Sequence, residues 1–151
     1  MQYAACVLTI RRSSIAELRA EEHGLVEMNM ATAQPGEPVA IDWDFYARAE
    51  ADGAVDVLAV WGGRALVGYC VLMHFVHPQS GARLVTSCGL YVRPGADAGF
   101  GLRRLIDAAG EIGRAGGGQR FSVEAAIGSP LGRMLPRLGF RARTVNYEKV
   151  L

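Results

Sequence analysis

The feature that most constrains this fold is a change of hydrophobic period about two thirds of the way along the chain. Residues 83–92 form a continuous apolar run that predicts a strand, stopped by Arg93-Pro94-Gly95. From residue 99 to residue 115, apolar side chains recur every three or four positions, which predicts an amphipathic helix. Because a strand passes through a glycine-bearing turn directly into a helix, we expect a mixed α/β fold.

The remaining segments extend this pattern over the whole chain. Ser14, followed three residues later by Glu17, predicts a capped first helix after an opening strand. Gly62-Gly63 predicts a tight hairpin, and Ser129-Pro130 predicts the start of a short helix. We expect strands at 3–10, 55–61, 65–76, 83–92, 121–127 and 141–151, and helices after Ser14 and at 42–51, 99–115 and 131–138.

The composition fits a single domain that covers residues 1–151. Half of the 151 residues are apolar and 21% are charged, which is enough apolar material for one sizeable core. The net charge is +1 and there is no basic stripe, which argues against a nucleic-acid partner. No apolar run approaches the roughly 18 residues that span a bilayer, and the cysteines, an odd number, are widely separated. We therefore expect no membrane partner, no disulfide framework and a reducing cytoplasm.

The turn before the long helix has the composition of a phosphate-binding loop. The first backbone N–H groups of a helix are unpaired and carry the positive end of the helix dipole, so they attract phosphate oxygens. Gly99 and Gly101 remove side chains that would block this approach. No Gly-Lys-Ser/Thr follows, which excludes a Walker loop, and the late position disfavours a dinucleotide-binding fold. An ordinary strand-to-helix turn with two glycines is the alternative.

The order of these segments resembles the GNAT superfamily of acetyl-CoA-dependent N-acetyltransferases. The main motif of that family is an Arg or Gln, two residues, Gly, any residue, and Gly or Ala, at a helix start after the fourth core strand. Gly99 and Gly101 match it, whereas Ala96 stands where the Arg or Gln is usual. The Leu-Gly-Phe that ends at Phe140 is similar to the end of the family's next helix.

The resemblance covers residues 40–151 best, and it implies a GNAT-like α/β fold. We expect a mixed central sheet of six to seven strands with flanking helices in a single domain. Trp43 and Tyr46, followed by a Leu-Val-Gly-Tyr segment, resemble a subgroup found in phages and their bacterial hosts.

The resemblance also implies how acetyl-CoA would bind as a co-substrate. In the family, the pantetheine arm enters a gap between the fourth and fifth strands and bonds the fourth like an added strand, and the pyrophosphate takes the glycine loop. Ser129 lies near a family position that often faces the coenzyme, with a plain helix cap as the alternative role. The implied coenzyme-binding residues are Leu90, Tyr91, Val92, Asp97, Ala98, Gly99, Phe100, Gly101, Leu102 and Ser129.

Acyl transfer from a thioester to an amine needs a base for the amine and an acid for the leaving thiolate. Many family members carry the acid, a Tyr, where this chain has Leu135. We expect Tyr147, on the last strand, to replace it, and Glu124, a carboxylate in an apolar strand, to be the base. A structural Tyr and a Glu that faces solvent or pairs with an Arg are the alternatives.

Other reactive side chains are given ordinary roles. His74 and His77 are expected at surface or turn positions, in poor geometry for a metal, and no metal site is expected. Cys88 could be an acylated nucleophile, but its apolar surroundings predict a buried thiol.

Two functions from different classes compete. One is an N-acetyltransferase that moves an acetyl group to a primary amine of an unidentified small molecule or protein, by direct transfer in a ternary complex. The other is a non-catalytic protein that binds or senses acyl-CoA, which Ala96 and Leu135 favour. An interaction domain without coenzyme is a third alternative. The apolar last strand also allows a homodimer joined at a sheet edge.

Overall fold

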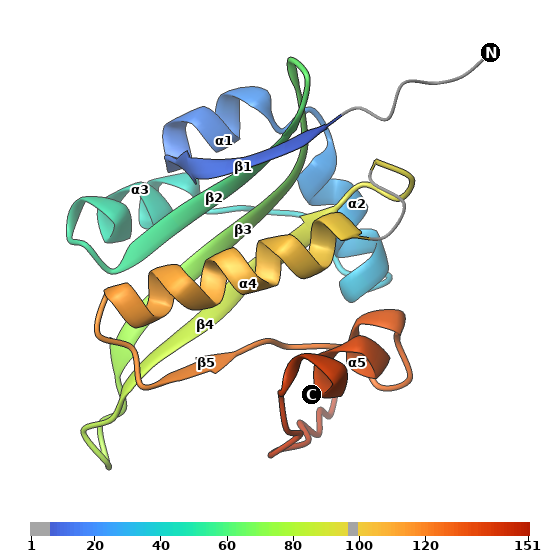
Figure 1. Cartoon of the computed structure of the whole chain (residues 1–151). Helices are drawn as coiled ribbons and strands as arrows, with labels where there is room; N and C mark the ends of the chain where they lie inside the picture. The colour runs from blue at the N-terminus through green and yellow to red at the C-terminus, as the bar shows by residue number, and fades with distance from the viewer. Residues whose placement is uncertain (1–6, 97–99) are drawn as a thin grey trace.

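The computed structural model describes residues 7–96 and 100–151, and its centre is a five-stranded sheet (Figure 1). The strands follow the order β1-β2-β3-β4-β5, antiparallel as far as β4 and parallel between β4 and β5. A parallel pair needs a crossover connection, and the long helix between the two strands supplies it. The strands are β1 (Leu8–Ser13), β2 (Val55–Gly62), β3 (Ala65–Val76), β4 (Arg83–Val92) and β5 (Arg120–Ser122).

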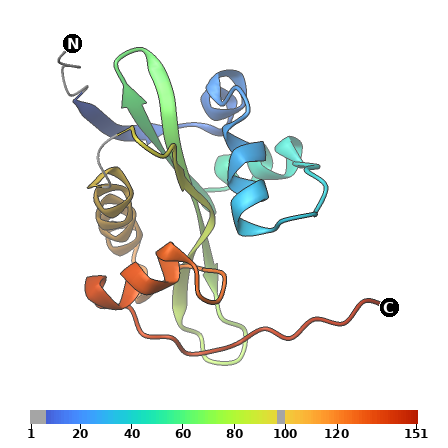
Figure 2. The ribbon, with the colours of Figure 1, turned by 90° about the vertical axis from the view of Figure 1, so that its right-hand side faces the viewer.

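Helices cover both faces of the sheet, as Figure 2 shows from the side. Three helices before β2 lie on one face, and the long helix between β4 and β5 lies on the other. The helices are α1 (Ile15–Glu21), α2 (Leu25–Ala33), α3 (Trp43–Ala51), α4 (Phe100–Ala115), α5 (Pro130–Met134) and a 3₁₀ helix, η1 (Leu135–Leu138). Within the described residues, no helix combines the length and apolar content needed to cross a membrane.

Each face of the sheet buries its own apolar cluster. Because successive side chains of a strand point to opposite faces, Val57 and Ala59 of β2 pack toward α1, α2 and α3, whereas Leu58 and Val60 pack toward α4. The predicted amphipathic stripe of α4 is confirmed, since it buries Leu105, Ile106 and Ala109. The fold is therefore a two-sided α/β sheet, as the sequence predicts.

The prediction of six to seven strands is wrong for the described residues, which form five. The fifth strand, expected over residues 121–127, is only Arg120–Ser122, because β4 and β5 pair at three positions and then separate. The strand expected over residues 141–151 is absent, since these residues are exposed and make no backbone hydrogen bond to any other described residue.

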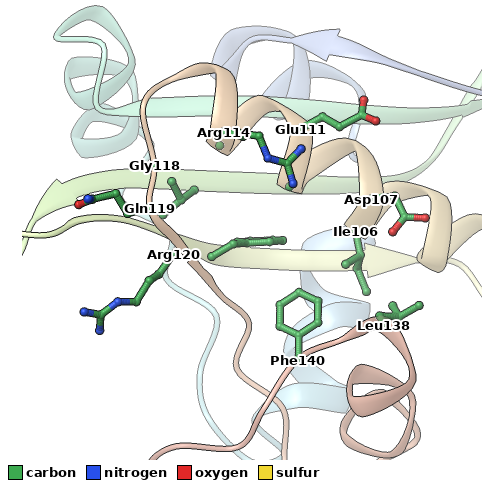
Figure 3. A pocket seen from close by; sticks show the side chains of 13 residues that line it. Ile106, Asp107, Glu111, Arg114, Gly118, Gln119, Arg120, Leu138 and Phe140 are labelled. Carbon is green, nitrogen blue, oxygen red and sulfur yellow. The ribbon is translucent and has the colours of Figure 1, made fainter.

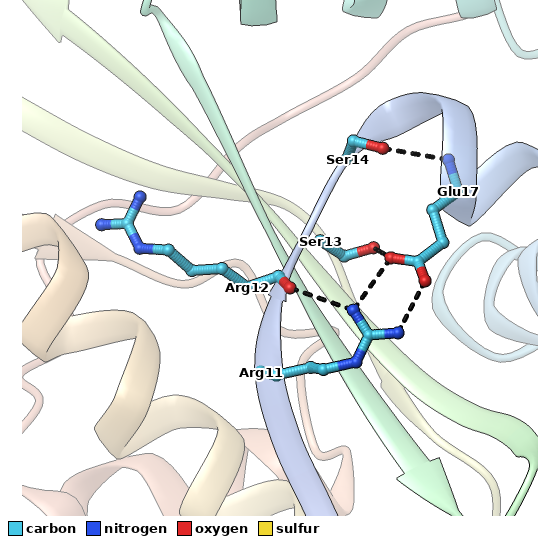
Figure 4. A network of polar contacts seen from close by, with 5 residues as sticks. All are labelled: Arg11, Arg12, Ser13, Ser14 and Glu17. Carbon is cyan, nitrogen blue, oxygen red and sulfur yellow. Dashed lines mark hydrogen bonds and ion pairs between the residues drawn. The ribbon is translucent and has the colours of Figure 1, made fainter.

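Polar side chains fix the passage from β1 into α1 (Figure 4). The hydroxyl of Ser14 accepts the N–H of Glu17 at 3.1 Å, which confirms one half of the predicted capping box. The Glu17 carboxylate instead accepts two bonds from Arg11, at 2.6 and 3.1 Å, and one from the Ser13 hydroxyl. Because Arg11 and then Ser13 donate to it, the pKa of Glu17 is lowered from its usual value.

A second polar group ties the first three strands together. Asp56 of β2 accepts a bond from Arg12 of β1 at 2.9 Å and lies 2.8 Å from Nε2 of His74 on β3. The side chain of His74 is only 18% exposed, so its assignment to the surface was wrong. Among the described residues, no three His, Cys, Asp or Glu side chains are grouped as a metal site would need. The Asp56–His74 pair is a cross-strand contact.

Two backbones approach closely at Gly68, where β3 faces the end of β4. A Cβ at position 68 would lie 2.6 Å from the carbonyl oxygen of Tyr91 and 3.0 Å from a methyl group of Val92. Real Cβ atoms do not come so near to backbone, so only glycine allows β3 and β4 to pair at this distance.

Gly68→Ala is therefore expected to lower the free energy of unfolding by about 1–3 kcal/mol, as overpacking usually does. The matched control is Gly110→Ala in α4, where an added methyl group would meet only a ring carbon of Phe121 at 3.8 Å. Because alanine favours a helix over glycine by up to about 1 kcal/mol, the control is expected to keep or raise stability. Urea unfolding followed by circular dichroism measures both. Wild-type stability in Gly68→Ala would contradict the close approach.

Candidate functional site

The candidate site is the opening between β4 and β5. The two strands pair at Leu84–Arg120, Val85–Phe121 and Thr86–Ser122. The register of β4 with β3 then shifts by one residue, which leaves Cys88 without a β3 partner. Such a bulge bends the strand that carries it and increases its twist. Beyond Thr86, β4 continues to Val92, and no other strand of the described residues pairs with it on its β5 side.

The free edge of β4 presents backbone groups to this opening. The N–H of Arg93 donates to the carbonyl of Val67 on the β3 side, at 2.7 Å. In an antiparallel pair, residues that bond to one neighbour alternate with residues that face the other way. Tyr91 therefore bonds toward β3, and the N–H and C=O groups of Leu90 and Val92 face the opening.

The side chains of these three residues divide between the faces of the sheet, as the sequence predicts. Leu90 and Val92 pack against the cluster beneath α4. Tyr91 packs with the cluster under α1, α2 and α3. The predicted coenzyme contacts of Leu90 and Val92 thus involve backbone atoms, and Tyr91 lies on the other face.

The start of α4 lies just beyond the end of β4 along the chain. Asp97, Ala98 and Gly99, predicted to hold pyrophosphate, lie outside the described residues. Of the rest of that loop, Phe100 is 64% exposed at the first helical position, Gly101 is buried, and Leu102 is half-buried. From Phe100 onward, the first turn of this 16-residue helix holds no acidic residue that would oppose the positive end of its dipole.

Ser129 caps a helix. Its hydroxyl accepts the N–H of Gly132 at 3.1 Å, and Pro130 follows at the first helical position, as predicted. The hydroxyl is therefore engaged by α5, and a contact of Ser129 with the coenzyme stays a prediction.

Cys88 and Glu124 each follow by two residues the last β4–β5 pair, Thr86 and Ser122. Cys88 is exposed, so the prediction of a buried thiol was wrong, although it holds for Cys70. Desolvation of the Cys88 thiol and then the negative charge of Glu124 raise its pKa. The Glu124 carboxylate therefore interacts electrostatically with the Cys88 thiol.

Tyr46 of α3, noted in the sequence only for its resemblance to the phage and bacterial subgroup, was not predicted as a site residue. Desolvation, followed by interaction with Cys88, raises the pKa of this half-buried phenol. A protonated phenol therefore lies near the same opening. A site role for Tyr46 was hard to predict from the sequence, because an aromatic residue at helical spacing usually packs in a core.

The other proposed acid is placed differently. Tyr147 lies on the C-terminal segment and is 93% exposed, with no hydrogen-bond partner among the described residues. Leu135, which occupies the position of the family's Tyr, is buried in η1. Glu124 is also exposed, and no described Arg forms an ion pair with it. Electrostatic interactions thus connect Cys88 with Glu124 and with Tyr46, whereas Tyr147 is exposed on the C-terminal segment.

A separate open cavity of about 480 Å³ lies between the second half of α4, β5 and η1 (Figure 3). Phe140 and Phe121 meet edge to face beside it, with ring centroids 5.6 Å apart. Asp107, Glu111 and Arg114 of α4 line its upper side. None of the predicted coenzyme-binding or catalytic residues lines this cavity, so it is distinct from the opening between β4 and β5.

Comparison with solved structures identifies the class of fold. A ribosomal-protein-alanine N-acetyltransferase from Brucella melitensis biovar Abortus 2308 superposes with a TM-score of 0.74 at 18% identity, covering 96% of this chain and 98% of that one. An aminoglycoside acetyltransferase from an uncultured soil metagenomic sample gives a TM-score of 0.72 at 18% identity, covering 96% and 99%. The chain therefore has a GNAT-like α/β fold, which it shares with these two acetyltransferases.

The likeness extends to a protein described as a transcriptional regulator, from Bacillus halodurans C-125. It gives a TM-score of 0.74 at 16% identity and covers 96% of this chain and all of that one. No family model matches the sequence, and no curated protein matches it. At these identities the comparisons establish the fold alone.

The proximity of Glu124 and Cys88 predicts a specific alkylation behaviour. In a Cys6→Ser background, iodoacetamide should modify Cys88 slowly near neutral pH and faster as the pH rises, because the thiolate is the reactive form. Glu124→Gln should speed the reaction several-fold at a fixed pH near 8, since loss of the negative charge lowers the thiol pKa.

Glu148→Gln, which removes an exposed carboxylate from the C-terminal segment, is the matched control and should leave the rate unchanged. Mass spectrometry measures the rate, and buried Cys70 should remain unmodified. Equal rates in Glu124→Gln and wild type would show that this carboxylate does not act on the thiol.

Proposed function

We propose that this chain is an N-acetyltransferase, which moves the acetyl group of acetyl-CoA to a primary amine of a small molecule or protein by direct transfer in a ternary complex. The observation that carries the proposal is the opening between β4 and β5, with free β4 backbone along one side and a carboxylate at its inner end. The same fold in solved acetyltransferases supports it.

The residues that line the opening fit acetyl-CoA. Backbone groups of Leu90 and Val92 are free to bond the amides of a pantetheine arm, as an added strand would. The start of α4, together with residues 97–102, would take the pyrophosphate, and exposed Arg93 and Arg103 add positive charge near it. The coenzyme would supply the acetyl thioester, and the protein would supply its orientation and the proton transfers.

The proton transfers would fall to groups at the inner end of the opening. Glu124, directly or through a water molecule, would take the proton from the attacking amine. Tyr147 would return a proton to the leaving sulfur if the C-terminal segment were brought to the opening. Tyr46 is a second candidate for this acid, because a phenol is protonated at neutral pH and this one interacts electrostatically with Cys88.

The alternative is a non-catalytic protein that binds or senses acyl-CoA. Ala96 in place of the family's Arg or Gln and buried Leu135 in place of its Tyr favour it. The structural likeness to a protein described as a transcriptional regulator is a further observation on this side. We also propose that the chain belongs to the phage and bacterial subgroup. It would work in a reducing cytoplasm, where Cys70 and Cys88 stay free.

Coenzyme binding is tested by calorimetry with acetyl-CoA and with free CoA. Leu90→Pro removes an N–H that faces the opening and spares the bonds between β3 and β4, so it should weaken binding by about 3–10-fold, the worth of one hydrogen bond. Leu90→Val, which keeps the N–H, should bind as wild type does. Absence of binding by a folded wild-type protein would overturn both the enzyme and the sensor proposals.

Catalysis is tested by turnover with a panel of primary amines. Glu124→Gln should lower turnover by about 10²–10⁴-fold, the usual contribution of a general base, and should leave coenzyme affinity unchanged. Glu111→Gln, a carboxylate of the separate cavity, is the control and should keep full turnover. Tight acetyl-CoA binding without turnover of any amine would favour the sensor, and full turnover in Glu124→Gln would remove this residue from the mechanism.

A further inference from the structure

The cavity between α4, β5 and η1 (Figure 3) is large enough to hold a small molecule. Its volume of about 480 Å³ lies within the roughly 300–1,000 Å³ that is typical of ligand pockets. The residues predicted to bind acetyl-CoA or to catalyse acetyl transfer lie elsewhere. A ligand in this cavity would therefore be additional to the coenzyme.

The floor of the cavity is apolar and recessed. It consists of five apolar side chains, which are Val85, Ile106, Phe121, Leu138 and Phe140. Two of them, Val85 and Ile106, are buried, and the other three are half-buried. An apolar patch on which a protein partner docks is exposed at the surface, whereas this floor lies below its rim. The floor therefore suits the apolar group of a small ligand.

A glycine that packing does not require keeps part of this cavity open. Glycine weakens a helix relative to alanine, so a glycine within α4 needs a reason. At Gly113 the reason is packing, because a Cβ there would lie 3.3 Å from methyl groups of Val85. At Gly110, which lines the cavity, a Cβ would meet only a ring carbon of Phe121 at 3.8 Å. The missing side chain of Gly110 thus adds space to the cavity and relieves no close contact.

Charged side chains of both signs surround the floor. They are Asp107, Glu111, Arg114 and Arg120, and all four are exposed. Within the part of the chain that the structure describes, none of the four forms an ion pair within 4.0 Å. Glu111 and Arg114 are three residues apart on α4, which places their Cβ atoms about 5–6 Å from each other. A carboxylate and a guanidinium group thus lie close together beside the floor, and each keeps its capacity for a partner.

A zwitterion with an apolar group matches these features. An α-amino acid carries its ammonium and carboxylate groups on a single carbon, so both can be engaged by side chains that are neighbours on a helix. The guanidinium of Arg114 can take the carboxylate in the two-point geometry that these groups favour, and Glu111 can take the ammonium. A ligand with only one kind of charge would be repelled by one of the two side chains.

We propose that this cavity binds a free α-amino acid with a large apolar side chain, such as phenylalanine or leucine. Arg114 would hold the carboxylate, Glu111 would hold the ammonium group, and the apolar side chain would cover Phe121 and Phe140. The proposal does not depend on acetyl transfer, because it uses no residue of the opening between β4 and β5.

The first experiment is a calorimetric titration of the wild-type protein with L-phenylalanine and with L-leucine, both of which should bind. Two analogues of phenylalanine each lack one charge. N-acetyl-L-phenylalanine has no ammonium group and imitates the C-terminus of a peptide, whereas L-phenylalaninamide has no carboxylate and imitates an N-terminus. Each should bind about 10–100-fold more weakly than phenylalanine, the worth of one hydrogen bond to a charged group. Glycine, which keeps both charges and lacks the apolar side chain, should also bind more weakly.

Variants of the cavity test which residues hold the amino acid. Arg114→Gln and Glu111→Gln should each lower the affinity for L-phenylalanine by about 10–100-fold. Gly110→Leu changes no charge and should abolish binding, because its side chain would occupy the cavity. Arg19→Gln and Glu27→Gln, at exposed positions of α1 and α2 on the other face of the sheet, are the matched controls and should bind as wild type does. Circular dichroism checks that each variant is folded.

Methyl NMR locates the bound amino acid. Addition of L-phenylalanine should shift the methyl resonances of Ile106 and Leu138, which line the cavity. The methyl resonances of Ile15, in the cluster on the other face of the sheet, should stay in place. Those of Leu90, whose backbone borders the opening between β4 and β5, should also stay in place.

Four outcomes would overturn the proposal. A folded wild type that binds neither L-phenylalanine nor L-leucine would show that the cavity is not an amino-acid site. An analogue that binds as tightly as phenylalanine would indicate the end of a peptide in place of a free amino acid. Full affinity in Gly110→Leu, or shifts at Leu90 without shifts at Ile106, would place the ligand elsewhere. Loss of binding in Arg114→Gln together with shifts at Ile106 would support the proposal even if Gly110→Leu failed to fold.

Discussion

The bulge at Cys88 is the constraint on which the rest of the candidate site depends. It lies two residues after Thr86, the last residue of β4 that pairs with β5. Because a bulge bends and twists its strand, β4 turns away from β5 at this point and pairs with β3 alone as far as Val92. One unpaired residue thus creates both the opening and the free backbone edge beside it.

Close packing of α4 on the sheet places a helix start at the outer end of that opening. A Cβ at Gly113 would lie 3.3 Å from methyl groups of Val85, so α4 packs closely on β4 at this point. Buried Leu105 and Ala109 fix its rotation, and the helix dipole points from Phe100 toward the end of β4. The positive helix terminus and the free strand edge therefore come from the same two elements, which makes their relative position rigid.

The elements with strong periodicity could be predicted from the sequence, whereas those that depend on distant partners could not. The α4 stripe, the Ser14 cap and the β2–β3 hairpin are encoded by neighbouring residues and are present, although the hairpin turns at Gly63-Arg64, one residue later than predicted. The strand expected over residues 141–151 has suitable residues, but pairing needs an edge that sequence periodicity does not locate. Cys88 was misplaced for a similar reason, because an apolar run does not reveal that a bulge turns one residue outward. The proximity of Tyr46 to Cys88 joins α3 to β4, and only the tertiary fold brings them together.

Which side chain serves as the catalytic acid depends on the position of the C-terminal segment. Leu135 is buried where the family has its Tyr, so this chain has an apolar contact in place of a proton donor. Tyr147 is exposed on a C-terminal segment that makes no backbone hydrogen bond to another described residue, so an acid role for it would need that segment to move to the opening. Tyr46 needs no such movement, since it belongs to α3 and its phenol already interacts with the Cys88 thiol. The choice between the two acids therefore depends on whether the C-terminal segment moves.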